Sequence, residues 1–174
     1  NRRWIPQIEQ MLQDQGNVRM VSEKVVAVVN RDSAIVDCIF VLNNEGPADS
    51  VWIGFPDESS GPDESTGDDE YSGAMPPFRS WVDGVEVACT PMPDADFEKY
   101  ANDDRFWWTK RVYFPAGATR TVRDRYVGGI GFEVTGRRWF EYILWSGASW
   151  KGPIGSGEIE VRLKGIRPAW ITRT

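Results

Sequence analysis

The sequence predicts an all-β protein, and specifically an antiparallel β-sandwich of the immunoglobulin-like or jelly-roll-like kind. About eight or nine short runs of alternating apolar and polar residues follow one another, separated by stretches with turn composition. No strand–helix–strand alternation of the type that builds a parallel sheet is present. The stretch 142–163 adds a third indication, because two alternating runs are joined there by a corner rich in Trp, Gly and Pro.

The 174 residues fit one domain with an appendage. Residues 1–17 are predicted to form a short N-terminal helical arm, since apolar residues recur at helical spacing between Pro6 and Gly16. An arm that packs on its own domain is favoured over a helix that binds a partner, because short isolated helices are unstable in water. Residues 18–174 are then expected to form a single β-sandwich domain.

The strands are predicted in chain order from period-two alternation and β-branched composition. Residues 18–30, 34–44 and 50–56 give the first three. Residues 78–89 form a hairpin that turns at Asp83-Gly84, a strong hairpin signal. Residues 93–100 are read as a helical or turn segment. Four further strands are expected within 105–115, 119–129, 137–147 and 157–166.

A long acidic loop interrupts the series of predicted strands between residues 57 and 73, which hold seven carboxylates and no basic residue. A solvated insertion is the simplest interpretation. A calcium site is a second one, because hard cations prefer several oxygen ligands, although no calcium-loop spacing is present. Docking against the basic stretch 105–125 is a third. The candidate metal ligands are Asp63, Glu64, Asp68, Asp69 and Glu70, and no other cofactor is expected.

Cys38 and Cys89 both occupy strand positions on the predicted core face. They can form one inter-strand disulfide or remain two buried free thiols. No C-x-x-C spacing is present.

Composition excludes several classes of function. The chain has no histidine, which removes Ser-His-Asp and Cys-His catalysis and most catalytic zinc sites. We therefore expect no enzyme activity, and the catalytic alternative is glycoside hydrolysis by a pair of strand carboxylates such as Glu133, Glu141, Glu158 or Glu160. The net charge of −6 argues against nucleic-acid partners. No apolar run is long enough to predict a membrane span.

The high aromatic content, 13% of residues, raises the possibility of carbohydrate binding, because Trp and Tyr rings stack on the apolar faces of sugars. The candidates are Trp107, Tyr113 and Trp145. In the strand 105–115, Trp107 and Tyr113 share the face opposite to Trp108, which is expected in the core. The alternative is that the large rings fill the space between two sheets.

Several pieces of the chain resemble an uncharacterised family of exported bacterial β-sandwich domains, known only as a domain of unknown function. The most specific piece is the stretch 142–163 with its corner Ser149-Trp150-Lys151-Gly152-Pro153. The resemblance implies an extracellular or cell-envelope location and no catalytic residues. It also favours a Cys38–Cys89 disulfide, since oxidising compartments let disulfides persist.

The leading functional hypothesis is therefore a non-catalytic exported domain that binds an unidentified protein, cell-surface or glycan partner through a sheet face or a loop. Trp150, Lys151, Gly152 and Pro153 are assigned a structural role, with Trp150 closing one end of the sandwich and Gly152-Pro153 turning the chain into the last strand.

Overall fold

A computed structural model describes residues 16–57, 78–93, 106–142 and 150–167. The predicted helical arm lies outside these residues apart from its last two positions. All five candidate calcium ligands, the segment 94–100 and Trp145 also lie outside them.

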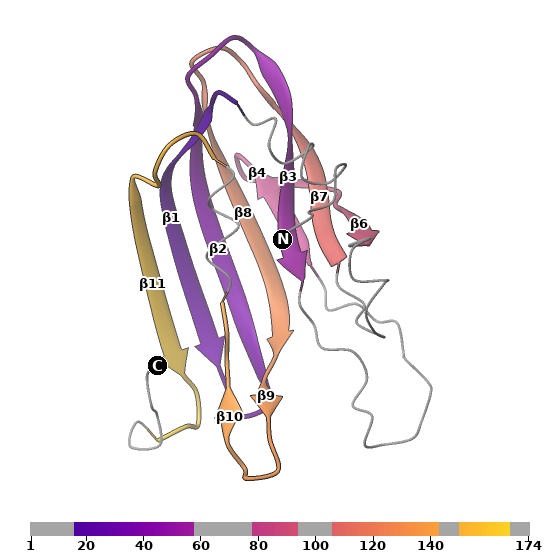
Figure 1. The fold of residues 1–174 in the computed structure, drawn as a ribbon, viewed down its shortest axis with the longest axis vertical. Coiled ribbons are helices and arrows are strands. Elements are labelled where there is room, and N and C mark those ends of the chain that lie inside the picture. The colour runs from indigo at the N-terminus through magenta and orange to yellow at the C-terminus, as the bar shows by residue number, and fades with distance from the viewer. Residues whose placement is uncertain (1–15, 58–77, 94–105, 143–149, 168–174) are drawn as a thin grey trace, which may run out of the picture.

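The described residues form eleven strands in two large sheets and one small ribbon (Figure 1). The six-stranded sheet has the order β11-β1-β2-β8-β4-β5, and the three-stranded sheet that packs on it has the order β3-β7-β6. The strands are β1 (Val18–Val29), β2 (Ser33–Asn44), β3 (Asp49–Asp57), β4 (Arg79–Val82), β5 (Val85–Val87), β6 (Thr90–Pro93), β7 (Phe106–Phe114), β8 (Thr119–Gly129), β9 (Gly131–Phe132), β10 (Arg138–Trp139) and β11 (Ser156–Leu163).

The predicted all-β, two-layer architecture is confirmed. One pairing differs from the prediction of a purely antiparallel sandwich, because β11 runs parallel to β1, while every other pair is antiparallel. A hairpin cannot join two parallel strands, so the chain reaches β11 through a long connection after β10. No helix in the described part of the chain is long and apolar enough to cross a membrane.

The core lies between the two sheets and follows the alternation of the strands. Inward residues of β1 and β2, such as Val25, Ala27, Val36 and Leu42, are completely or almost completely buried. The three-stranded sheet covers the half of this face that includes Leu42 with Val51, Ile53, Val112 and Phe114. Burial of this apolar area is the main stabilising contribution to the fold.

Asn44 fixes the place where the chain passes between the sheets. Its side chain is fully buried at the end of β2. The Nδ2 group donates to the carbonyl oxygens of Pro47 and Pro115 at 2.7 and 3.1 Å, and Oδ1 accepts from the Gly46 N–H at 3.0 Å. One amide therefore joins the β2–β3 crossing to the β7–β8 crossing, and its own polar groups are satisfied.

The predicted Asp83-Gly84 hairpin is confirmed between β4 and β5. Both turn residues have positive φ, 49° and 82°, as a type I′ turn requires. The Asp83 carboxylate also accepts hydrogen bonds from the Thr121 N–H and from the Arg120 guanidinium, and these lower its pKa. The turn is thus attached to the neighbouring strand β8.

The predicted corner before the last strand is present at Trp150 to Pro153. Trp150 is half-buried against the core cluster, and Gly152 has a φ of 67°, which favours glycine. The Lys151 N–H donates to the Val18 carbonyl at 2.9 Å, and its ammonium lies 3.0 Å from Glu45. The corner is therefore attached to the first residue of β1.

Gly155 lies directly beside β1 at a bulge, where the β1–β2 register shifts between Met20 and Ser22. A Cβ added at Gly155 would lie 2.3 Å from the Val21 carbonyl oxygen, whereas one added at Gly157 would meet nothing within 4 Å. We therefore expect Gly155→Ala to lower the free energy of unfolding by about 1–3 kcal/mol, because backbone must move to admit the methyl group.

Urea denaturation of Gly155→Ala beside the matched control Gly157→Ala measures this effect. The control is expected to unfold within about 0.5 kcal/mol of the parent. Equal stabilities for the two variants would contradict the close approach of Gly155 to β1.

Candidate functional site

The outer face of the six-stranded sheet carries a shallow groove over β1, β2, β8 and β11. Its volume is about 400 Å³, and its floor consists of Val26, Val28, Ile35 and Ile39. Ile35 and Ile39 keep 37% and 36% of their surface exposed. These residues alternate with the buried ones on the same strands, so they lie on the opposite side of the sheet from the core. An apolar strip in the middle of the widest sheet is thus left open to solvent.

Charged side chains surround this apolar floor, and most of them are paired. The residues that add charge to the groove lining are Lys24, Asp37, Arg123, Arg125 and Arg162. Lys24 lies 3.1 Å from Glu158, Arg162 donates two hydrogen bonds to Glu160, and Arg123 donates two to Asp37. Such exposed pairs contribute little to stability, but they hold the long side chains beside the floor.

Arg125 is the basic groove residue that has no carboxylate partner in the described part of the chain. In cross-strand register it lies between Asp37 of β2 and Arg79 of β4. Both oxygens of Asp37 accept from Arg123, and Arg79 is held by Glu86 at 2.7 and 2.8 Å. The Arg125 guanidinium is therefore an exposed positive charge at the rim of an apolar surface.

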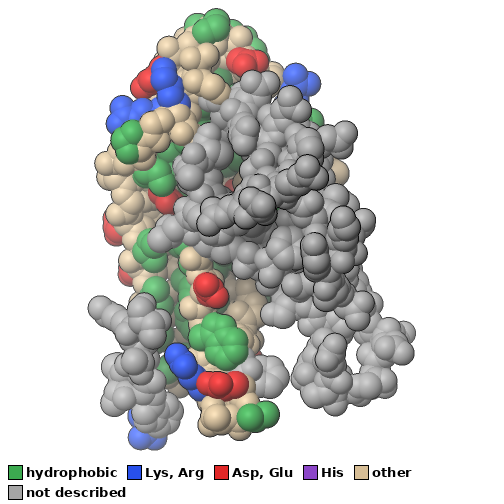
Figure 2. Space-filling model, viewed as in Figure 1, with side chains coloured by type: hydrophobic (Ala, Val, Ile, Leu, Met, Phe, Trp, Pro, Cys, Tyr) green, Lys and Arg blue, Asp and Glu red, His purple; other side chains and the backbone are tan. Residues whose placement is uncertain are grey.

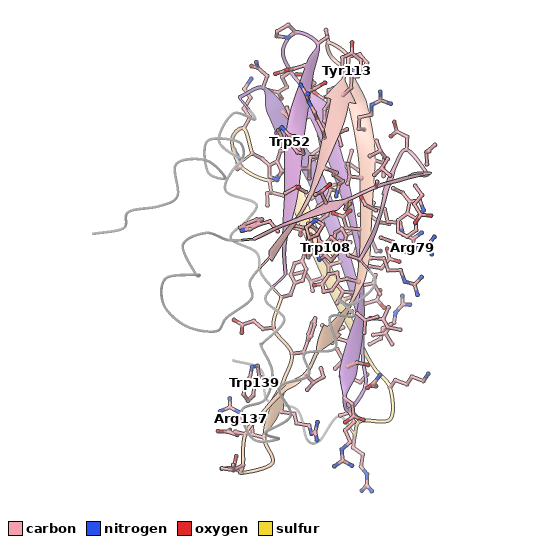
Figure 3. All side chains as sticks on the ribbon, turned by 90° about the vertical axis from the view of Figure 1, so that its right-hand side faces the viewer. Trp52, Arg79, Trp108, Tyr113, Arg137 and Trp139 are labelled. Atoms are coloured by element: carbon pink, nitrogen blue, oxygen red, sulfur yellow. The ribbon has the colours of Figure 1, made fainter. Side chains whose placement is uncertain are left out.

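Trp81 of β4 contacts two guanidinium groups, one of which, Arg123, also lines the groove. Arg79 Cζ and Arg123 Cζ lie 4.9 and 5.0 Å from the centre of its ring, within the range of cation–π attraction. In Figure 3, Arg79 projects from the side of the molecule that carries this face, and Trp108 lies between the sheets. The rim of the groove is thus ordered by stacking as well as by ion pairs.

A buried ion pair lies directly behind this face. Lys110 of β7 and Asp124 of β8 have side chains that are 1% exposed, and the ammonium lies 2.7 and 2.8 Å from the two carboxylate oxygens. Ser80 of β4 donates to the same carboxylate at 2.6 Å. Asp124 is therefore neutralised from the opposite sheet and hydrogen-bonded from its neighbouring strand, as a buried charge requires.

An aromatic cluster packs beside the buried ion pair and excludes water from it. Phe78 and Trp108 stack with centres 5.2 Å apart and planes 4° apart, and Phe55 contacts Phe78 and Tyr126 at 5.5 and 5.1 Å. The Lys110 ammonium also lies 5.7 Å from the centre of the Phe78 ring. These rings fill the space between the sheets, which was the alternative to a ligand-binding role for the large rings.

Of the predicted sugar-binding residues, Trp107 and Tyr113 lie in the described part of the chain, and only one of them is exposed. Trp107 is only 8% exposed, so its assignment to the surface was wrong, while Tyr113 is 56% exposed as predicted. The exposed Trp139 lies at the other end of the molecule from Tyr113 (Figure 3). Alternation assigns a residue to a face of a strand but does not show which part of that face is covered.

Both cysteines are free thiols, so the disulfide favoured by the family resemblance is not formed. Cys38 is buried as predicted, and its Sγ lies 3.5 Å from Tyr142 Oη, which donates to Glu23 at 2.9 Å. Burial raises the pKa of Cys38 to about 12 and raises that of the half-buried Cys89 as well. Neither thiol has the lowered pKa that marks a reactive cysteine.

The strand carboxylates considered for glycoside hydrolysis are all on the surface. Glu158 and Glu160 are occupied by Lys24 and Arg162 on the outer face, and Glu133 and Glu141 are exposed. In the part of the chain that the structure describes, no group of three or more Cys, Asp and Glu residues is arranged to hold a metal ion.

Sequence reasoning missed both the groove and the buried ion pair. The alternation of residues 105–115 already placed Lys110 among the apolar residues of the core face, and Asp124 is the lone acid in a basic strand. A lysine on the core face and a lone acid in a basic strand were the two signs in the sequence that could have indicated a buried ion pair. The groove gave no signal, because its floor residues belong to runs that also supply the core.

Comparisons with known proteins bear on the fold. No protein-family model matches the sequence, and a search of curated proteins finds no match. Among solved structures, the chain is similar to a putative nutrient binding protein of Legionella pneumophila, with 22% identity and a TM-score of 0.63. The match covers 84% of this chain and 50% of the Legionella protein, so this chain spans half of that protein's length. At this identity the likeness shows the fold alone.

Weaker similarity is found to an M1 zinc metallopeptidase of Deinococcus radiodurans. Identity is 12% and the TM-score is 0.36, with 67% of this chain and 21% of the peptidase covered. A variant of that enzyme with bound substrate gives 11% identity, the same TM-score, and 67% and 22% coverage. Similarity at this level carries no argument about fold or activity.

The buried ion pair makes a stability prediction. Lys110→Met leaves Asp124 as an uncompensated buried charge, so we expect the free energy of unfolding to fall by about 3–5 kcal/mol at pH 7. The double variant Lys110→Met/Asp124→Leu removes both charges and is expected to recover most of the loss. Arg111→Met is the matched control, since Arg111 is exposed on the same strand. Chemical denaturation measures all three, and equal losses in Lys110→Met and Arg111→Met would contradict the pairing.

The free thiols are checked by titration with Ellman's reagent. In protein freshly purified without a reducing agent, we expect two thiols to react after unfolding in guanidinium. In the native state we expect Cys38 to react very slowly, because burial raises its pKa. A Cys38→Ser variant assigns the slow thiol. Finding no free thiol after unfolding would show that the disulfide forms.

Proposed function

We propose that this chain is a non-catalytic binding domain that recognises a partner protein through the groove on the outer face of its six-stranded sheet. The observation that carries the proposal is the exposed Arg125 beside an apolar floor whose other basic neighbours are paired. Within the described ranges, this surface therefore presents exposed apolar area and one positive charge that no carboxylate pairs.

The chemistry of the groove specifies its occupant. Exposed branched side chains favour an apolar contact, and a guanidinium favours a carboxylate through paired, charge-assisted hydrogen bonds. The fitting partner is therefore an extended protein segment that carries an acidic residue next to aliphatic ones. The ion pairs Lys24–Glu158 and Arg162–Glu160 form a polar rim of the kind found around protein interfaces.

The open shape of the groove favours a protein segment over a small molecule. Small-ligand sites enclose most of their ligand's surface, whereas this groove is a shallow depression on a sheet face. Sugar binding is less well supported, because the exposed rings Tyr113 and Trp139 lie at opposite ends of the described structure.

The likeness to the Legionella protein supports a binding role and an exported setting. That protein's description as a nutrient binding protein is consistent with a fold used for recognition. We propose that this chain works outside the cytoplasm, in the cell envelope or beyond it.

Selection of short random peptides displayed on phage against the full chain tests the proposed function. We expect enriched sequences that place Asp or Glu within two positions of Val, Ile or Leu. For a synthetic peptide with the selected sequence, Arg125→Gln is expected to weaken binding by about tenfold to a hundredfold, because a hydrogen bond to a charged group is worth about 1.5–3 kcal/mol.

Arg111→Gln is the matched control, since Arg111 is an exposed arginine on the other sheet, and it is expected to bind the peptide as the parent does. Ile35→Asp, which places a charge on the floor of the groove, is expected to abolish binding. Enrichment without acidic residues, binding that survives both groove variants, or no enrichment at all would contradict the proposed function.

A further inference from the structure

The strand β11 ends the six-stranded sheet with an unpaired edge in the described part of the chain. Figure 1 shows it as the outermost strand, on the side of the sheet away from β4. Its register with β1 places Ile159, Val161 and Leu163 on the core side, beside Val25, Ala27 and Val29. They are nevertheless 47%, 51% and 38% exposed.

Another edge strand, β3, differs in this respect. Its core-side residues Val51 and Ile53 are 5% and 4% exposed. The apolar side chains at the β3 edge are therefore covered. Figure 2, which views the core side of the six-stranded sheet, shows hydrophobic side chains at the surface along the side where β11 lies. The apolar layer therefore reaches the β11 edge uncovered, and an exposed edge of this kind can add a further strand.

The backbone of β11 shows which residues could pair outward. The Lys164 N–H donates to the Val29 carbonyl at 2.8 Å, so it points toward β1. Successive residues of a strand direct their N–H and C=O groups to opposite sides. Gly157, Ile159, Val161 and Leu163 consequently direct their backbone groups to the free edge.

The outer-face charges of this strand change sign about its middle. Glu158 and Glu160 precede Val161, and Arg162 and Lys164 follow it. From this pattern we propose that two copies of the chain pair antiparallel through β11, with Val161 on the two-fold axis. Glu160 then faces Arg162 of the second copy, Glu158 faces Lys164, and Ile159 faces Leu163 on the core side.

Two features agree on this register. Val161, Ile159 and Leu163 become hydrogen-bonded pairs, which matches the direction of their backbone groups. Each charged position meets the opposite sign, which stabilises cross-strand pairs. A register centred on Glu160, or a parallel arrangement in register, would instead place Glu160 opposite Glu160.

Sedimentation analysis of the full chain from low to several hundred micromolar tests the proposed dimer. We expect a concentration-dependent shift from 19.7 kDa to twice that mass, with modest affinity because one strand pair gives a small interface. Val161→Pro is expected to raise the dissociation constant by at least about tenfold, because it removes an outward N–H without breaking a bond to β1. Circular dichroism checks that the variant folds.

A charge-exchange experiment tests the register itself. Glu160→Arg and Arg162→Glu each place like charges opposite one another, so each variant alone is expected to be monomeric. Mixed together, they form a heterodimer in which every facing pair is opposite in sign. The double variant Glu160→Arg/Arg162→Glu is self-complementary again and is expected to dimerise as the parent does.

A parent chain that stays monomeric at the highest concentration would overturn the proposal. So would a dimer that survives Val161→Pro, or single charge variants that fail to associate when mixed although both are folded. Arg162 belongs both to the groove lining and to this interface. Peptide binding is therefore tested with Arg125→Gln and Ile35→Asp, which lie outside β11, and dimer formation is tested with the β11 variants.

Discussion

The buried contact between Lys110 and Asp124 sets the relative position of the two sheets. Each side chain is 1% exposed, so neither charge can be satisfied by water, and each depends on the other sheet to supply its partner. Ser80 adds a third strand to the contact, and the stacked rings of Phe78 and Trp108 exclude solvent beside it. Apolar packing alone tolerates sliding of one sheet over another. The ion pair adds a directional contact between the sheets, because each buried charge must lie against its partner.

The same contact determines what the outer face displays. Strand side chains alternate, so directing Asp124 inward directs both of its neighbours, Arg123 and Arg125, outward. Arg123 donates hydrogen bonds to Asp37 and lies over the Trp81 ring. Among the described residues, Arg125 has no carboxylate partner, since the acid of its own strand, Asp124, is paired with Lys110 in the core. The free charge of the groove is thus a consequence of the internal ion pair, and the apolar floor beside it belongs to strands whose other side is the core.

The two proposed surfaces have a common origin in the parallel strand β11. It closes one side of the groove with Glu158, Glu160 and Arg162, and it leaves its own far edge unpaired. A parallel strand is delivered by a long connection, here anchored by the hydrogen bonds of Lys151 and Gly155 to β1. The start of β11 is held close to β1, because Gly155 leaves no room for a side chain between them. The opposite edge of β11 has no pairing strand among the described residues.

Local pattern by itself determined the long strands β1, β2, β3, β7, β8 and β11 and the type I′ hairpin at Asp83-Gly84, since these follow from period-two alternation and from backbone preferences of adjacent residues. It also placed Cys38 in the core. It did not predict the short strands β6 and β9, and β10 covers only two residues of the strand expected over 137–147. Tertiary structure alone decided the parallel pairing of β11, the burial of Trp107, the free state of the two thiols, the partnership of Lys110 with Asp124 and the groove beside Arg125. All of these depend on which distant segments lie against a face. A residue's neighbours across a sheet or between layers are set by the packing of the whole chain, so no short stretch of sequence contains them.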